Sequence, residues 1–432
     1  MKSLFFSVGL FFISTVVLGQ NLYFPPIVGN EWETIDPATL NWCETGNKAL
    51  DDFLIEKGTK GFIILKDGKI VKEKYFDTFT KDSVWYWASA GKSITSFMVG
   101  MAQEKGLLNI NDKTSKYLGE GWTSLTPEQE NKITIWHQLT MTSGLDDSGD
   151  DLDCMVPECL TYKADAGQRW AYHNAPYRLL HNVIAEAWGN TYQNFMNTQL
   201  TVKTGIGGLW LDGVLYSKPR NMARFGLLAL NKGTWNGQQI LGDQTYVDAM
   251  SVPSQMINKS YGLLWWLNGQ ESFMLPGVQL AINRFLIPNA PADMYCALGK
   301  NDQKIYVVPS QNLVVVRVGN AGGEIAGAVS SFDNQLWEKI NELTCTSSTQ
   351  ESSKDNFQIY PNPFVDQIEI LSDENFIDAE VTIYSVQGSL VYQGKFKKDS
   401  LTNVLKGLSS GVYFLRFKNG KGMNTRKKIV KY

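Results

Sequence analysis

The chain has 432 residues, of which 43% are hydrophobic and 19% are charged, and its formal net charge at pH 7 is −3. This length is sufficient for two or three folded domains. The weakly acidic balance, without a basic patch in the central part of the chain, argues against a nucleic acid as partner.

A short apolar segment opens the chain. One lysine in residues 1–3 precedes an apolar run at residues 4–18, and small Gly19 follows. This order is typical of a secretory signal peptide, so we expect residues 1–19 to be removed before Gln20. No later stretch approaches about 18 unbroken apolar residues, so we expect an exported protein without a stable membrane span.

Periodic patterns indicate a mixed α/β (α+β) fold for the central part of the chain. Apolar residues at helical spacing fill residues 47–57, 89–105, 175–188, 218–231 and 326–343. Alternating strand patterns lie at residues 61–76, around the turn Asp67-Gly68, and at residues 294–318. Early strands, central helices, late strands and a final helix predict an antiparallel sheet flanked by helices, with a helical subdomain beside it.

Ser89 and Lys92 are the first residues with a chemical implication. They stand three residues apart at the start of a helical pattern, so a helix that begins at Ser89 places the serine hydroxyl and the lysine amine on one face. A buried lysine with a lowered pKa can remove the proton of a serine hydroxyl and make it a nucleophile. The N–H groups of a helix N-terminus also favour a developing oxyanion. Taken alone, the same two residues are an ordinary N-cap and a solvated lysine.

The chain also contains five cysteines and an Asp-rich loop. Cys154 and Cys159 lie close enough in sequence to close a small ring, whereas Cys296 falls in a strand pattern that predicts a buried, inert thiol. The loop contains Asp146, Asp147, Asp150, Asp151 and Asp153. Its spacing misses the calcium-loop pattern, so we interpret it as a solvated acidic loop.

Tyr172 and Asn174 stand immediately before another helical pattern, where a tyrosine can lie between a serine hydroxyl and a leaving group. The chain has three histidines, which leaves few candidates for a Ser-His-Asp triad. His137 and His181 fall within helical runs and are predicted to be packed or solvated, whereas His173 is placed to influence Tyr172. No zinc-binding spacing occurs, so we expect neither a metal nor another cofactor.

The end of the chain changes in character. Residues 346–356 are polar and lack a period, which predicts a linker. Beyond it, strand-like segments separated by Gly- and Asn-rich turns predict a small all-β, Ig-like sandwich at residues 357–432. We therefore expect a large domain at residues 20–345 and a small one after the linker. A sugar-binding module is less favoured for the small domain, because no Trp occurs after Trp337.

In combination, the motifs resemble one family. The S-x-x-K pattern at 89–92, the Y-x-N pattern at 172–174 and the segments 133–145, 217–228 and 261–266 resemble the serine β-lactamase-like hydrolases. This family includes class C β-lactamases, D-alanyl-D-alanine carboxypeptidases, family VIII esterases and 6-aminohexanoate-dimer hydrolases. The resemblance covers residues 25–343 and implies a β-lactamase/transpeptidase-like fold. It also implies a Cys43–Cys345 bridge, because the first and last helices lie side by side in that fold.

The resemblance implies a role for each motif residue. Ser89 would be the acylated nucleophile, Lys92 its general base and Tyr172 the proton carrier to the leaving group. Asn174 would form hydrogen bonds near Lys92 and the substrate.

The family's third element is usually K-T-G or H-x-G on a strand that lines the site. Lys203-Thr204-Gly205 has matching letters but follows a helical stretch, so it reads as a basic last turn with a glycine cap. The better counterpart is Ala297-Leu298-Gly299-Lys300 at the end of a strand pattern. There, Gly299 would let the backbone approach the substrate, and the N–H groups of Lys300 and Ser89 would form the oxyanion hole.

The resemblance implies a monomeric serine hydrolase that acts on a small ester, amide or peptide. Because Ala297 stands where a β-lactamase carries a cation, esters and uncharged amides fit better than β-lactams, although Lys300 offers another cation nearby. β-Lactamase or D-amino-acid peptidase activity remains an alternative. A catalytically silent, surface-binding member of the fold is another.

The C-terminal region resembles a different family. Tyr-Pro-Asn-Pro at 360–363, the turn at 386–388, Leu-Ser-Ser-Gly-Val-Tyr at 408–413 and the basic segment 426–431 resemble the sorting domain of type IX secretion in Bacteroidetes. The resemblance implies the secretion machinery as a partner and release, or display on the cell surface, of a Gram-negative bacterium. It also implies removal of this tail.

Overall fold

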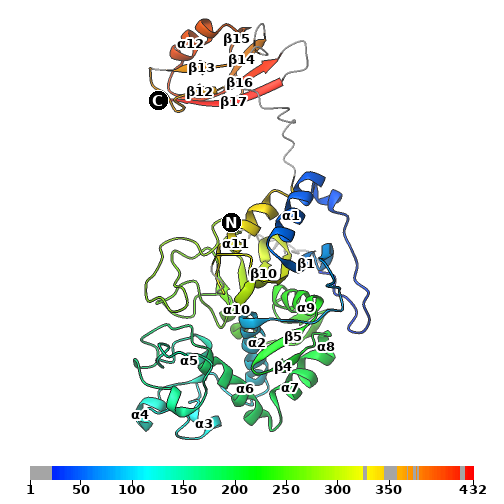
Figure 1. The fold of residues 1–432 in the computed structure, drawn as a ribbon, viewed down its shortest axis with the longest axis vertical. Helices are drawn as coiled ribbons and strands as arrows, with labels where there is room; N and C mark the ends of the chain where they lie inside the picture. Colours follow the sequence, from blue (N-terminus) through cyan, green and yellow to red (C-terminus); the bar gives the residue numbers. More distant parts are fainter. Residues whose placement is uncertain are drawn as a thin grey trace, which may run out of the picture. The chain divides into compact units, whose positions relative to one another are not determined.

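The computed structural model describes residues 22–324, 328–344, 358–366, 368–372, 376, 379–418 and 424–432. The chain forms two compact units, Met1–Cys345 and Thr346–Tyr432 (Figure 1). Each unit has its own hydrophobic core. The expected signal peptide at residues 1–19 and the expected linker at residues 346–356 lie outside the described residues. Within the described part of the chain, no helix combines the length and apolar character needed to cross a membrane.

The first unit is built on a six-stranded antiparallel sheet in the order β2-β1-β11-β10-β9-β8. The first strand in the chain, β1, pairs with the last strand of the sheet, β11, so that Ile63 faces Val316. The predicted antiparallel sheet is therefore confirmed. Its strands are β1 Thr59–Lys66, β2 Lys69–Tyr75, β8 Trp266–Leu267, β9 Tyr295–Gly299, β10 Gln303–Val308 and β11 Leu313–Gly319.

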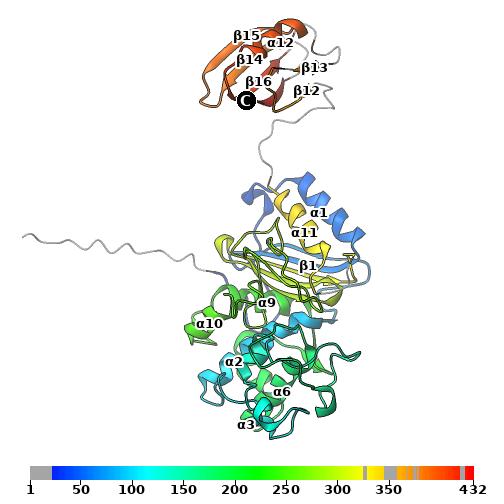
Figure 2. The same ribbon diagram turned by 90° about the vertical axis from the view of Figure 1, so that its left-hand side faces the viewer.

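Helices cover both faces of this sheet. On one face, α1 (Glu44–Glu56) and α11 (Ser331–Asn341) pack against each other, and α9 (Pro219–Leu230) lies against the other face (Figure 2). Gly226 allows α9 to approach closely, because a Cβ there would lie 2.5 Å from Val314 Cγ1. Strand β11 is consequently buried along its whole length, which explains its nearly continuous apolar sequence.

Apart from α9, which covers the sheet, the chain between β2 and β8 forms the helical subdomain. Its longest buried element is α2, in which every residue from Gly91 to Ala102 is buried, because the helix packs between α6, α10 and the edge of β9. A three-stranded sheet, β3-β5-β4, lies beside it. The helices are α2 Gly91–Glu104, α3 Ser115–Leu118, α4 Pro127–Glu130, α5 Ile135–Leu139, α6 Asn174–Trp188, α7 Tyr192–Phe195, α8 Val202–Thr204 and α10 Gln244–Met250. The three strands are β3 Trp85–Tyr86, β4 Leu209–Leu211 and β5 Val214–Ser217.

The second unit contains a four-stranded sheet, β15-β14-β16-β17, and a two-stranded sheet, β12-β13. It also contains α12 (Lys398–Lys406), which the strand-only prediction missed. Leu401 and Leu405 of this helix are buried in the core of the unit. The strands are β12 Gln358–Tyr360, β13 Glu369–Leu371, β14 Glu380–Ser385, β15 Leu390–Lys395, β16 Gly411–Lys418 and β17 Asn424–Lys431.

Candidate active site

Ser89 lies in a tight turn that precedes the helix. Residues Ala88–Ala90 form a single 3-10 turn that leads directly into α2 at Gly91, so the α-helix begins two residues later than the helical pattern at 89–105 indicates. Ala88 has a φ of 47°, in the left-handed region that residues other than glycine rarely occupy. The turn therefore takes an uncommon backbone conformation directly before the serine.

Strand β5 and the buried Trp87 hold this turn in place. The backbone N–H of Trp87 donates to the carbonyl of Leu215 at 2.8 Å, and its indole Nε1 donates to Ser217 Oγ at 2.6 Å. Since Trp87 is completely buried, the backbone before Ser89 has little freedom to move. The serine is thus fixed by contacts on its N-terminal side and by the start of α2 on its C-terminal side.

Lys92 brings two of the predicted site residues together. Its Nζ lies 2.8 Å from Ser89 Oγ and 2.8 Å from Asn174 Oδ1, as the sequence patterns suggested. Asn174 is the first residue of α6, which places its amide beside the lysine. The same Nζ lies 4.8 Å from the ring centroid of Tyr172 and 4.2 Å from that of Tyr177.

Burial changes the acid–base properties of Lys92. The side chain is only 2% exposed, and desolvation lowers its pKa from 10.5 to about 7. The nearby carboxylate of Asp153 raises this pKa and the guanidinium of Arg178 lowers it, both by less than desolvation does. A large fraction of Lys92 is therefore a neutral amine at neutral pH, which is the form that accepts a proton.

Tyr172 lies against the same serine from the segment before α6. Burial raises the pKa of its phenol to about 12, and hydrogen bonds with Ser89 and Trp266 oppose that rise. Its ring packs on the indole of Trp266, with ring centroids 5.5 Å apart. The phenol is therefore protonated over the whole neutral range and can donate its proton.

The end of β9 packs directly against the turn that carries Ser89. A Cβ at Gly299 would lie 2.4 Å from the carbonyl oxygen of Trp87 and 3.1 Å from the backbone nitrogen of Ala90, so only glycine fits. Lys300 follows in a short turn and has an exposed side chain. The predicted strand end at Gly299 is confirmed, whereas Lys203-Thr204-Gly205 ends a helix, with Gly205 in the left-handed conformation.

A buried group of charges supports the turn after Lys300. Lys304 is completely buried, and its Nζ lies 3.2 Å from Asp302 and 3.0 Å from Asp333. Arg317 donates to the backbone carbonyls of Asn301 and Asp302 at 3.0 and 3.2 Å. These contacts hold both Asn301 and Asp302 at positive φ, and so fix the path of the backbone beside Ser89.

Some of these residues line a pocket of about 210 Å³ in the first unit, whereas Tyr172 and Gly299 are not among its lining residues. Ser89, Lys92 and Asn174 form one part of its lining, and Lys300 contributes from the β9–β10 turn. Three further residues that the sequence analysis did not assign to the site, Asp153, Tyr177 and Arg178, also line the pocket. Tyr177 and Arg178 follow Asn174 by three and four positions in α6, so helical spacing was the signal that could have identified them.

The three histidines lie outside this pocket lining. His181 is buried, its ring stacks on Tyr192 with centroids 3.9 Å apart, and burial lowers its pKa to about 3. His137 contacts the N-cap residue Thr134 at 3.0 Å, which is a structural role. His173 is buried, and its Nδ1 has no hydrogen-bond partner among the described residues.

The Asp-rich loop is solvated at Asp150, Asp151 and Asp153, which are exposed, and two ion pairs anchor it. Asp147 pairs with Arg169 at 2.5 Å, and Asp153 pairs with Arg178 at 3.3 Å. The predicted bridge between Cys154 and Cys159 is present in this loop, and Cys296 is a buried free thiol. Cys43 is also disulfide-bonded, while its expected partner, Cys345, lies outside the described residues.

The fold of the first unit is that of the β-lactamase-like proteins. Residues 53–213 match the Beta-lactamase family model, so the first unit carries a β-lactamase family domain. Residues 358–432 match the Secretion system C-terminal sorting domain, so the second unit is a sorting domain.

Individual relatives are distant. An uncharacterised protein of Alkalihalophilus pseudofirmus is 25% identical over 315 residues, which cover 63% of this chain and 87% of that protein. A putative 6-aminohexanoate-dimer hydrolase from Bacillus anthracis has a similar structure, with a TM-score of 0.52, 18% identity and coverage of 68% of this chain and 80% of that one. A putative β-lactamase from Bacteroides dorei gives a TM-score of 0.55, 16% identity and coverage of 70% and 99%. At these identities the solved structures establish the fold alone.

Proposed function

We propose that this protein is an exported serine hydrolase that cleaves ester or amide bonds through an acyl-Ser89 intermediate. The observation that carries the proposal is the 2.8 Å contact between Ser89 Oγ and a buried lysine whose pKa is lowered to about 7. A serine hydroxyl becomes nucleophilic when a neighbouring base takes its proton, and Lys92 is the base within reach.

In the first step, Ser89 Oγ attacks the carbonyl carbon while its proton passes to the neutral Nζ of Lys92. The carbonyl oxygen becomes an oxyanion, for which the backbone N–H groups of Ser89 and Lys300 are the proposed donors. The close packing of Gly299 against the Ser89 turn supports this pairing, because it brings the two backbone segments together.

Collapse of the tetrahedral intermediate breaks the bond to the leaving group. Tyr172 is the proposed proton donor, since its phenol stays protonated at neutral pH and has Ser89 as a hydrogen-bond partner. The Lys92 ammonium then returns the proton to the phenolate. Water hydrolyses the acyl-enzyme by the same path in reverse, which regenerates Ser89.

Esters and uncharged amides are the preferred substrates in this proposal. Ala297, in the position where related β-lactamases carry a cation, is buried in β9 and offers no charge to a substrate carboxylate. The name of the Bacillus anthracis relative, a putative 6-aminohexanoate-dimer hydrolase, agrees with amide cleavage. β-Lactamase or D-amino-acid peptidase activity is the second candidate, because the exposed Lys300 places a cation at the pocket.

Export completes the proposal. The sorting domain at residues 358–432 supports passage through the type IX machinery to the medium or the cell surface. The N-terminal signal peptide, predicted from residues 1–19, would deliver the chain to the periplasm first.

A fluorophosphonate probe tests the enzymatic assignment. We expect the probe to label the native protein, and the Ser89→Ala variant to remain unlabelled while it retains the native melting temperature. If the native protein is not labelled, it is a catalytically silent member of the fold. If the native protein is labelled, a panel of p-nitrophenyl esters, nitrocefin and D-amino-acid amides separates ester and amide hydrolysis from the β-lactamase alternative.

A further inference from the structure

Arg178 connects two walls of the pocket from a single position on α6. It follows Asn174 by one helical turn, so the two side chains project from the same face of the helix. Its Nη1 lies 3.3 Å from the carboxylate of Asp153 and 3.4 Å from the backbone carbonyl of the same residue. Its Nη2 donates to the carbonyl of Asp212 at 2.7 Å.

The β4–β5 hairpin is the first of these walls. Its turn, Asp212-Gly213, lies so close to Arg178 that a Cβ on Gly213 would be 2.3 Å from Arg178 Nε. The phenol of Tyr177 also donates to the Gly213 carbonyl at 3.1 Å. Two neighbouring side chains of α6 therefore hold the turn that lines the pocket.

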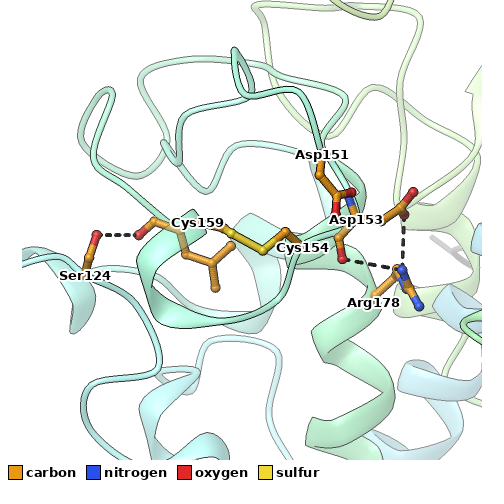
Figure 3. The surroundings of a disulfide bond; sticks show 7 residues. Ser124, Asp151, Asp153, Cys154, Cys159 and Arg178 are labelled. Atoms are coloured by element: carbon orange, nitrogen blue, oxygen red, sulfur yellow. Dashed lines mark hydrogen bonds and ion pairs between the residues drawn. A yellow bond between two sulfur atoms is a disulfide. The ribbon is translucent and has the colours of Figure 1, made fainter.

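The second wall is the loop closed by the Cys154–Cys159 disulfide. Asp153 stands immediately before the bridge, and Figure 3 shows its carboxylate directed at Arg178 from this loop. The disulfide links Cys154, the neighbour of Asp153, covalently to Cys159, so it restricts the positions that Asp153 can take. Asp153 is 56% exposed, and its contacts with Arg178 hold it at the pocket mouth.

The Asp153–Arg178 pair also contributes charge beside Lys92. The carboxylate raises the pKa of Lys92 and the guanidinium lowers it, whereas desolvation is the larger effect. The other polar or titratable groups that contact Lys92, act on it electrostatically or line its pocket are Ser89, Tyr172, Asn174, Tyr177, His181, Asp212 and Lys300. None of these forms an ion pair with Lys92 in the described part of the chain.

We propose that Arg178 is a positioning residue of the active site, which holds the disulfide loop and the β4–β5 hairpin as pocket walls and, with Asp153, places a balanced pair of charges beside Lys92. This inference rests on the proposed function, because it assigns a role to Lys92 as base. It predicts that the two charges act on catalysis with opposite signs.

The test is the pH dependence of acylation by p-nitrophenyl acetate, measured as the burst rate constant of the full chain. Arg178→Met removes a positive charge, so the pKa of Lys92 rises. The acid limb of the pH profile, where the rate falls because Lys92 becomes protonated, therefore moves to higher pH. Asp153→Asn removes a negative charge, and the limb moves to lower pH. We expect each shift to be about half a unit to one unit.

Two further variants serve as matched controls. Arg178→Lys keeps the charge, so we expect its acid limb to lie closer to the native one than that of Arg178→Met. The Arg178→Met/Asp153→Asn double variant removes both charges, and its limb should return towards the native position. If Arg178→Met does not fold, the other two variants test the inference. A shift of the Asp153→Asn acid limb to lower pH, with a nearly native acid limb in Arg178→Lys, supports it, and an unchanged Asp153→Asn limb overturns it.

The outcomes separate this inference from the proposed function. Opposite shifts of the two single variants support the inference. Shifts in the same direction, or unchanged acid limbs, overturn it. If the ion pair is purely structural, the loss of either partner breaks the same contact and should have the same effect on the pH profile. In the latter cases a native burst that disappears in Ser89→Ala leaves the serine hydrolase assignment intact. A native protein that shows neither this burst nor labelling by the fluorophosphonate probe overturns both.

Discussion

Lys92 Nζ lies 4.2 Å from the centroid of the Tyr177 ring, and in the described part of the chain the nearby carboxylate of Asp153 pairs with Arg178 and not with this lysine. A buried amine without a paired anion loses the solvation of its charged form and recovers only part of it from aromatic faces. This relationship explains why the pKa of Lys92 falls to about 7.

The pH profile of acylation should therefore have its acid limb near neutrality. Below pH 7 most of the lysine is an ammonium ion and cannot accept the Ser89 proton, so the rate should fall tenfold for each unit of pH. Tyr172 should impose no loss on the alkaline side until about pH 12. The burst rate constant with p-nitrophenyl acetate measures the profile, and a limb near pH 10 would identify an ordinary solvated lysine.

Removal of the amine should abolish acylation at neutral pH. In Lys92→Met the buried aliphatic volume is retained but the base is lost, so we expect the rate to fall about 10²–10⁴-fold. Covalent labelling of Ser89, followed over time by mass spectrometry, measures this loss. Native burst kinetics in the variant would exclude Lys92 as the base, provided that its melting temperature shows it to be folded.

Tyr172→Phe should affect substrates according to their leaving group. A nitrophenolate leaves without a proton, whereas an amine leaves an amide only when protonated. We expect hydrolysis of an amide to fall about 10²–10⁴-fold and hydrolysis of the nitrophenyl ester to fall much less. Parallel measurements of kcat/KM on the two substrates test this, and equal losses would show that the phenol does not protonate the leaving group.

Gly299→Ala should disturb the site through the backbone. The new Cβ would meet the Trp87 carbonyl at 2.4 Å, so the end of β9 must move away from the Ser89 turn. If the Lys300 N–H belongs to the oxyanion hole, kcat should fall about 10²–10³-fold. Gly149→Ala is the matched control, since nothing lies within 4 Å of its Cβ position. Nearly native kcat in Gly299→Ala would place the oxyanion donors elsewhere.

Lys304→Met should lower the free energy of unfolding. It leaves Asp302 and Asp333 without their buried cation, and breaking such a group costs about 3–5 kcal/mol. Lys232→Met, which removes one partner of the exposed pair with Asp248, should cost no more than about 1 kcal/mol. Urea denaturation measures both, and similar losses in the two variants would contradict the stabilising role of the buried charges.

Local patterns predicted much of this fold. Helical spacing located α1, α6 and α9 to within a few residues, because each helix buries one apolar face. The tight turn at Ser89 could not be read in the same way, since Ala88 adopts its positive φ under contacts from β5, far along the chain. The helix α12 was missed because few of its residues are apolar and it lies among strand patterns.

The candidate site was predictable only where residues carry a motif. Ser89, Lys92, Tyr172 and Asn174 follow recognisable spacings, and the structure brings them together. Asp153 and Arg178 belong to no motif, and their pairing depends on how the disulfide loop folds back onto α6. The charge balance within the pocket is a tertiary property, which a single sequence does not encode in any local pattern.

The burial of the Cys296 thiol limits the disulfide exchanges that the folded protein allows. It lies within β9, fully shielded, and burial raises its pKa far above that of a free thiol, so it is inert towards exchange once the sheet has formed. In an unfolded chain it would compete for Cys154 or Cys159. Burial of Cys296 in the sheet therefore protects the Cys154–Cys159 bridge from thiol exchange once the protein has folded.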